Sequence, residues 1–276
     1  MDTDNRRFST GTNTITALRN IKVNTHSAVS RSSPQIQRII LMKSVVLGLA
    51  RHWLLFVNLL IAIWVGLPWL APVFMHWGWT SAGRTIYFIY SLQCHQLPER
   101  SFFLFGTKGM YSLAEIQTVW QRTTDMFILR QFNGNPEMGW KVAWSDRMVA
   151  MYTSILFGGL LYGLVRKQMK PISFWKFAIM LLPMALDGGT HALSDLAGIG
   201  QGFRDTNVWL QTLTNNALST AFYQGDALGS FNSWMRLITG LLLGIALVGF
   251  AFPYVNESFA DTVRRNEAAL MKGSRQ

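Results

Sequence analysis

Long apolar runs alternate with polar segments along this chain of 276 residues. Four runs, at 53–75, 148–165, 174–193 and 234–255, contain few charged residues. Each is close to the roughly 20 residues that a helix needs to cross a hydrocarbon core about 30 Å thick. The pattern therefore predicts an all-α, polytopic membrane protein with four transmembrane helices.

The polar connections also carry helical patterns. Glu115–Phe132 repeats apolar residues at i, i+3, i+4 and i+7 spacing, which predicts one amphipathic helix that ends at Gly134-Asn135-Pro136. Val208–Phe222 has a similar, shorter pattern in the last connection. Because such helices lie on a membrane surface or cover a bundle, we expect amphipathic helices in two extracytoplasmic loops.

The two ends of the chain are polar. Residues 1–37 are rich in Ser, Thr, Asn and Arg, and residues 1–50 are predicted to form a basic, largely disordered cytoplasmic tail. Within it, Ile39–Leu49 is apolar, and we expect it to lie along the membrane surface before the first span. The predicted membrane domain then covers residues 51–256, and residues 257–276 form a C-terminal cytoplasmic tail.

Composition supports a membrane location and gives an orientation. Half of the residues are hydrophobic, 14% are charged, and the formal net charge is +11. Basic residues concentrate in the first 51 positions and in the connection 166–170, whereas the connection 194–233 has more acids than bases. The positive-inside rule therefore places both termini in the cytoplasm. We expect a lipid bilayer as the surroundings, the cytoplasmic (plasma) membrane as the location, and no nucleic-acid partner.

Ionisable residues near a membrane span are candidate sites because they are costly there. Asp187 and His191 are four residues apart, so they face the same side of a helix. This pair is suited to metal binding, proton relay or an internal ion pair, and a structural role is the commonest outcome. Charged residues that border the spans, Asp146, Arg147 and Arg236, suit a network of salt bridges with Arg100 and Asp187.

A second candidate site is Cys94-His95, followed by a turn signal at Pro98 and by Glu99. Both Cys and His bind borderline metals, but adjacent side chains rarely bind one ion unless a turn brings them together. Cys94 is the chain's single cysteine, which excludes a disulfide scaffold. Cys94, His95 and His191 are the metal-ligand candidates. Gly159, Gly163, Gly240 and Gly244 have the spacing that lets helix backbones approach closely.

Cys94-His95-Gln96-Leu97-Pro98-Glu99-Arg100-Ser101 resembles the opening signature of a family of bacterial membrane proteins, the domain of unknown function 2085. Leu186-Asp187-Gly188 and Asn232-Ser233-Trp234-Met235-Arg236-Leu237-Ile238-Thr239-Gly240 resemble two later motifs of that family. Its Cys-x-Arg-Cys pair is lost here, because alignment on Arg147 puts Ser145 and Met148 in those places. The resemblance, over about residues 84–250, implies these motif residues: Cys94, His95, Gln96, Pro98, Glu99, Arg100, Arg147, Asp187, Gly188, Asn232 and Arg236.

Two functions fit the sequence. The first is a non-catalytic accessory or scaffolding subunit of a larger respiratory or photosynthetic membrane complex, with other membrane subunits as partners; the lost cysteine pair and the aromatic-rich spans favour it. A histidine such as His191, His76 or His52 then becomes a candidate ligand for haem or pigment. The second is a metal-dependent membrane enzyme or redox protein with an extracytoplasmic site around Cys94, His95 and Asp187. The resemblance implies no activity and no specific cofactor.

Overall fold

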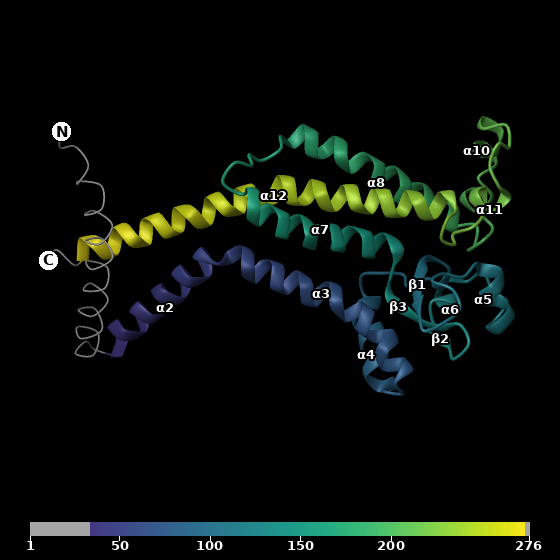
Figure 1. Ribbon diagram of the computed structural model, residues 1–276, viewed down its shortest axis with the longest axis horizontal. Coiled ribbons are helices and arrows are strands. Elements are labelled where there is room, and N and C mark those ends of the chain that lie inside the picture. The colour runs from purple at the N-terminus through teal and green to yellow at the C-terminus, as the bar shows by residue number, and fades with distance from the viewer. Residues whose placement is uncertain (1–33, 274–276) are drawn as a thin grey trace, which may run out of the picture. The chain divides into compact units, whose positions relative to one another are not determined.

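A computed structural model describes residues 34–273, and this part of the chain is mostly helical. Figure 1 shows its elements. In chain order they are α2 (Pro34–Arg51), α3 (Trp53–His76), α4 (Thr80–Ser91), a 3-10 turn (Pro98–Arg100), β1 (Ser101–Leu104), α5 (Leu113–Val119), α6 (Met126–Leu129), β2 (Gly134–Asn135), β3 (Gly139–Ser145), α7 (Asp146–Val165), α8 (Phe174–Asp195), α9 (Phe203–Thr206), α10 (Val208–Leu213), α11 (Thr220–Tyr223) and α12 (Phe231–Gly273). The chain divides into two compact units, of which one covers residues 54–257.

Helices occupy all four apolar runs. Within the described residues, three helices are long and apolar enough to cross a membrane, namely Trp53–His76, Asp146–Val165 and Phe231–Ala269. The fourth, α8, is a continuous helix of 22 residues, but its sequence contains charged residues and Gly188-Gly189. The count of three candidate spans is therefore one lower than the sequence predicted, because polar residues dilute the apolar character of α8.

Small residues let α7 and α12 approach closely. A Cβ atom added at Gly240 would lie 2.7 Å from the backbone oxygen of Arg147, and one added at Gly244 would lie 2.5 Å from that of Met151. Gly159 of α7 is similarly crowded, since an added Cβ would lie 2.2 Å from the Asn58 side chain of α3. Gly163 is in ordinary contact only. Three of the four glycines singled out in the sequence thus lie where a methyl group would clash.

A three-stranded antiparallel sheet of order β1-β3-β2 lies beside the helix ends. This sheet departs from the all-α prediction. Gly134 and Gly139 have φ angles of +114° and +74°, which favour glycine, and they allow β2 to turn into β3. Trp144 of β3 is completely buried and meets Tyr90 of α4 edge to face. The strand was missed because nearly all of its residues are buried, so Val142, Ala143 and Trp144 are consecutive apolar residues without the alternation that marks a strand.

The predicted amphipathic helix over Glu115–Phe132 is wrong as one element, because two short helices replace it. Ser112 and Glu115 form a capping box at the start of α5, and Trp120 then adopts an extended conformation that ends it. The Asp125 carboxylate accepts hydrogen bonds from Phe127 and Ile128, which starts α6 anew. The pattern over Val208–Phe222 is likewise split, into α10 and α11, by the left-handed residues Asn215 and Asn216. Local capping therefore outweighs apolar spacing in both loops.

The other compact unit contains α2 and the C-terminal part of α12. An ion pair of 2.7 Å joins Arg51 to Glu267, and Trp53 stacks on Phe259 at 5.8 Å between ring centroids. Ile39–Leu49 is part of α2, so the segment from residue 34 onward is helical, and α12 continues through most of the predicted C-terminal tail. The predicted disorder of residues 1–33 lies outside the described residues.

Candidate functional site

Asp226 connects two buried arginines at the end of the helices where the sheet lies. Its carboxylate accepts from Arg100 Nε at 2.7 Å and from Arg236 Nη1 at 2.5 Å. Arg100 also makes two parallel bonds of 2.7 Å to Asp195 at the end of α8, and Arg236 Nε donates to Asp146 at 2.8 Å. Asp226 thereby joins the 3-10 turn to the start of α12, and Arg236 extends the connection to the start of α7.

Asp187 is the centre of a second group of ion pairs. Its two oxygens accept from Arg147 Nη2 at 2.6 Å and from Arg204 Nη2 at 2.7 Å. His191, one turn later in α8, lies 3.4 Å from the same carboxylate and 3.7 Å from that of Asp226. The prediction that Asp187 and His191 share one face of a helix is therefore confirmed, and this face packs against Arg147 and Arg204.

We call these eight residues the ion-pair network: Arg100, Arg147, Arg204, Arg236, Asp146, Asp187, Asp195 and Asp226. Their four positive and four negative charges balance, and most of the side chains are almost completely buried. Burial by itself raises the pKa of Asp226, but Arg100 and Arg236 outweigh it and hold that pKa well below its usual range. The carboxylate consequently stays ionised and paired at physiological pH.

Three further motif residues, Asn232, Gly188 and Pro98, support this network. Asn232 accepts from Arg204 Nε at 3.2 Å and donates to two backbone oxygens, those of Arg204 and Gly225. Gly188 lies against the Arg147 guanidinium, where an added Cβ would be 3.0 Å from Nη1. Pro98 begins the 3-10 turn that carries Arg100. The motifs of the resemblance thus lie in one contiguous region.

Cys94 is buried in a tight turn. Its sulfur accepts from the backbone N–H groups of Gln96 and Ser145, both at 3.4 Å, and lies 3.7 Å from Ser145 Oγ. Gln96 adopts φ +53°, and its side-chain amide donates to the Tyr87 carbonyl at 2.9 Å. The position that the resemblance assigns to a family cysteine, Ser145, is therefore the direct neighbour of Cys94.

The three metal-ligand candidates belong to separate contacts. His95 Nδ1 accepts from the backbone of Leu97 at 3.0 Å, and burial together with Arg100 lowers the pKa of His95 well below its usual range. Cys94 contacts Ser145, whereas His191 contacts Asp187. Among the described residues, no three His, Cys, Asp or Glu side chains are grouped so that they could hold a metal ion.

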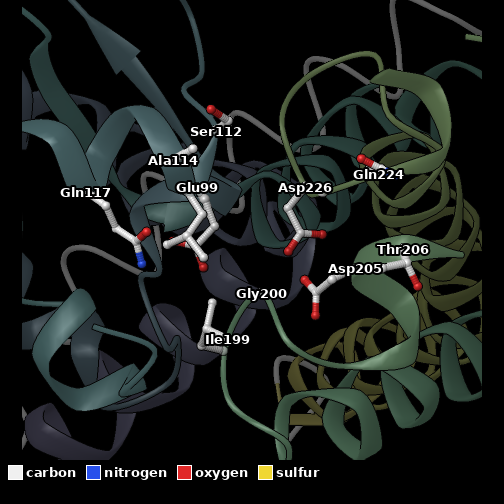
Figure 2. A pocket seen from close by; sticks show the side chains of 12 residues that line it. Glu99, Ser112, Ala114, Gln117, Ile199, Gly200, Asp205, Thr206, Gln224 and Asp226 are labelled. Carbon is white, nitrogen blue, oxygen red and sulfur yellow. The ribbon is translucent and has the colours of Figure 1, made fainter. Parts of the chain in front are cut away.

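A pocket of about 420 Å³ lies next to the ion-pair network (Figure 2). Glu99 and Gln117 line it from one side, and Asp205, Asp226 and Gln224 line it from the other. Glu99 is 1% exposed, and neither of its carboxylate oxygens has a hydrogen-bond partner among residues 34–273. Every other carboxylate named so far accepts a hydrogen bond, so Glu99 differs from the carboxylates of the network in having no partner.

Two buried groups near this pocket titrate near neutrality. Burial raises the pKa of Glu99 from 4.5 to about 7, despite the positive charge of Arg100. Burial also lowers the pKa of Lys141 to about 7, and its ammonium donates to the backbone oxygens of Gln96 and Arg130 at 2.8 and 2.6 Å. The pKa of Asp205 is raised by burial and by Asp226.

The pKa of Glu99 predicts a pH-dependent effect of Glu99→Gln. Because the folded pKa exceeds the unfolded value, the carboxyl of the folded protein retains its proton at pH values where the unfolded one has lost it, and stability falls as pH rises from 4.5 towards 7. The neutral amide avoids this loss. We expect the variant to be more stable than wild type by about 3 kcal/mol near pH 8 and by little near pH 4.5, in denaturant titrations. The exposed control Glu137→Gln should show no such difference, and an equal gain at both pH values would contradict the assignment.

Asp187→Ala is expected to impair folding and assembly. The substitution leaves Arg147 and Arg204 without their shared carboxylate in a buried place, which is costly. We expect a lower yield of folded protein in the membrane and a melting temperature lower by about 5 °C or more. Normal yield and an unchanged melting temperature would contradict a structural role for Asp187.

Sequence reasoning missed four residues of this region: Asp195, Arg204, Asp226 and Lys141. Three of them lie in the connection 194–233, whose charges appeared only as a guide to orientation. Asp226 is 126 residues from Arg100, and no local spacing relates the two. The sequence did contain a signal for these residues. The connection 194–233 has more acidic than basic residues, so its carboxylates were available as partners for the arginines near the span ends.

Comparison with known proteins gives a family and a distant relative. Residues 137–250 match the model of a family described as predicted membrane protein (DUF2085). The uncharacterised protein MJ1492 of Methanocaldococcus jannaschii is 27% identical over 191 residues, which are 67% of this chain and 80% of the relative. No solved structure matches the chain. The resemblance to the family is therefore confirmed, whereas the signature of the Cys94–Ser101 segment precedes the matched residues and stays a prediction.

Proposed function

Since residues 137–250 match the DUF2085 family of predicted membrane proteins, we propose that this chain is a four-span, non-catalytic accessory or scaffolding subunit of a larger membrane assembly. The observation that carries the proposal is that the charged motif residues form ion pairs with one another and with other residues of the same chain. Arg100, Arg147 and Arg236 are the groups that would bind an anionic substrate, and each donates to aspartates of the same chain. Their positive charge is thus already balanced within the fold.

The position of α8 supports a fourth span. Phe177, near its start, stacks on Phe250 of α12 at 4.4 Å between ring centroids. Asp187, ten residues further on, lies 3.4 Å from Thr239 of α12. The two helices therefore run alongside each other in opposite directions over about three turns, as Figure 1 also shows. If α12 crosses the bilayer, α8 crosses the same layer beside it, with its polar face turned towards the protein.

Charge distribution supports an orientation. The helix ends with the ion-pair network and the sheet are reached by the acidic connection 194–233, and the opposite ends are joined by the basic connection 166–170. The positive-inside rule places the sheet outside and both chain ends in the cytoplasm, with the plasma membrane of a bacterium as the proposed location. A cap held by ion pairs then forms the extracytoplasmic surface.

The exposed faces of the candidate spans leave area for neighbours. Only 22% of the apolar window of α3 and 17% of that of α7 is buried within the chain. Large side chains on these faces, such as Phe56, Trp64 and Phe157, are 37–60% exposed. Lipid covers such faces in any membrane protein, and aromatic side chains are also frequent in contacts between subunits.

Purification from the native membrane tests the proposal. The tagged chain is extracted in mild detergent, and the mass and protein composition of the particle are measured before and after a further size-exclusion step. We expect a particle well above the 31.3 kDa of one chain, with the same partner subunits in constant ratio. A chain without partners that holds one tightly bound metal, lost on Cys94→Ala or His95→Ala, would contradict the proposal and favour the metal-dependent alternative.

A further inference from the structure

The pocket beside Glu99 contains negative charge that the fold does not neutralise. Asp226 is paired with Arg100 and Arg236, so its charge is balanced. Glu99 has no hydrogen-bond partner, and Asp205 accepts from the backbone N–H of Gly202 at 2.8 Å and has no ion pair in the described part of the chain. A buried carboxylate without a partner is costly, so a cation that enters the pocket would remove that cost.

The rest of the lining indicates the kind of cation. Among the described residues, none that lines the pocket is Lys, Arg or His, and Leu113, Ala114 and Ile199 add an apolar surface. Gln224 and Thr206 supply polar groups on the side opposite Glu99 (Figure 2). Its volume of about 420 Å³ lies within the range of small-molecule sites, roughly 300–1,000 Å³. Within the described residues the carboxylates are not gathered as metal ligands, which favours an organic ion over a bare metal ion.

We propose that this pocket binds a small primary alkylammonium, with the ammonium group paired to Glu99 and Asp205 and the alkyl chain against Leu113 and Ile199. An ammonium group has three donors and no acceptor, which matches a wall of carboxylate and amide oxygens. The apolar residues exclude water from around the alkyl chain of the ligand. The lower local dielectric then strengthens the attraction between the ammonium and the carboxylates. This site uses residues outside the scaffolding role of the ion-pair network, so it is independent of the proposed function.

Thermal unfolding of the purified full-length protein tests the site. n-Butylammonium chloride is the probe, and n-butanol and sodium butyrate are matched neutral and anionic controls. At about pH 8, where Glu99 is ionised, we expect n-butylammonium to raise the melting temperature of wild type and of the exposed control Glu137→Gln by about 3–5 °C near saturation. Glu99→Gln should lose this rise. No rise in wild type, an equal rise in Glu99→Gln, or an equal rise with n-butanol would overturn the proposal.

Calorimetric titration of the unaltered protein gives a second test that needs no variant. Protonation of Glu99 removes the charge that the ammonium needs, and protonation of Lys141 and Asp205 acts in the same direction. Arg100 and the paired Asp226, which also face Glu99, keep their charges. We expect n-butylammonium to bind at least about tenfold more tightly near pH 8 than near pH 5.5. Equal affinity at the two pH values would overturn the proposal.

Discussion

Replacing Arg236 with alanine is expected to lower the free energy of unfolding by about 3–5 kcal/mol. The guanidinium donates to Asp146 at 2.8 Å and to Asp226 at 2.5 Å, and the side chain is 2% exposed. Both carboxylates are buried, so the substitution leaves two desolvated negative charges. Asp226 retains Arg100, whereas Asp146 loses the one ion pair that it forms within the described residues. The measurement is reversible unfolding by denaturant in detergent micelles.

An exposed ion pair supplies the control. Arg51 pairs with Glu267 at 2.7 Å, but their side chains are 51% and 42% exposed. Solvent screens such a pair, so Arg51→Ala should cost less than about 1 kcal/mol. Both variants lose one arginine. The expected difference in their free energies of unfolding therefore reflects the burial of the charges around Arg236. Equal costs would show that Arg236 is not part of a buried network.

Replacing Gly244 with alanine is expected to lower the free energy of unfolding by about 1–3 kcal/mol. The added Cβ would lie 1.8 Å from Ser154 Oγ and 2.5 Å from the backbone oxygen of Met151. The serine side chain can rotate, but the backbone of α7 cannot yield without moving the helix. The expected result is a separation of α7 and α12, which also weakens the Arg236–Asp146 pair between them.

Gly66 of α3 is the matched control. It is also a glycine in an apolar candidate span, and a Cβ added there would meet no atom within 4 Å. Gly66→Ala should be neutral or should stabilise the protein by up to about 1 kcal/mol, because alanine favours the helix. Thermal unfolding of both variants in one detergent compares them directly. A destabilisation by Gly66→Ala as large as that by Gly244→Ala would contradict the close approach of α7 and α12.

Periodicity and run length predicted the long helices well. The run 53–75 corresponds to α3 and the run 174–193 to α8, with ends that agree within a few residues. This success has a physical reason. In the hydrocarbon core of a bilayer no water is available, and a single apolar segment satisfies its backbone polar groups there by forming a helix. Whether α8 crosses the membrane could not be predicted as firmly. Asp187 lowers the hydropathy of its sequence, and the sequence alone does not show that this carboxylate is paired inside the protein.

The cap was predicted less well. Strand β3 and the break between α5 and α6 depend on short-range turn geometry, such as the positive φ of Gly139 and the cap at Asp125. These signals compete with apolar spacing over only a few residues, so spacing alone gave the wrong element.

The candidate site was predicted in part. Asp187, Arg147 and Arg236 were recognised because charge near a span is unusual. Their partners Arg204 and Asp226 lie in the polar connection 194–233. Charged residues are common in such a connection, so their presence does not indicate a site. Glu99 belonged to a motif, but its lack of a partner is a property of the folded chain alone.

The motif charges are expected to act as one structural network. A double-mutant cycle in the purified protein tests it, with Arg100→Ala, Arg236→Ala and the double variant compared by their free energies of unfolding. Because both arginines bind the single carboxylate of Asp226, we expect a coupling energy above about 1 kcal/mol. Additive effects within about 0.5 kcal/mol, in variants that each unfold cooperatively, would contradict it.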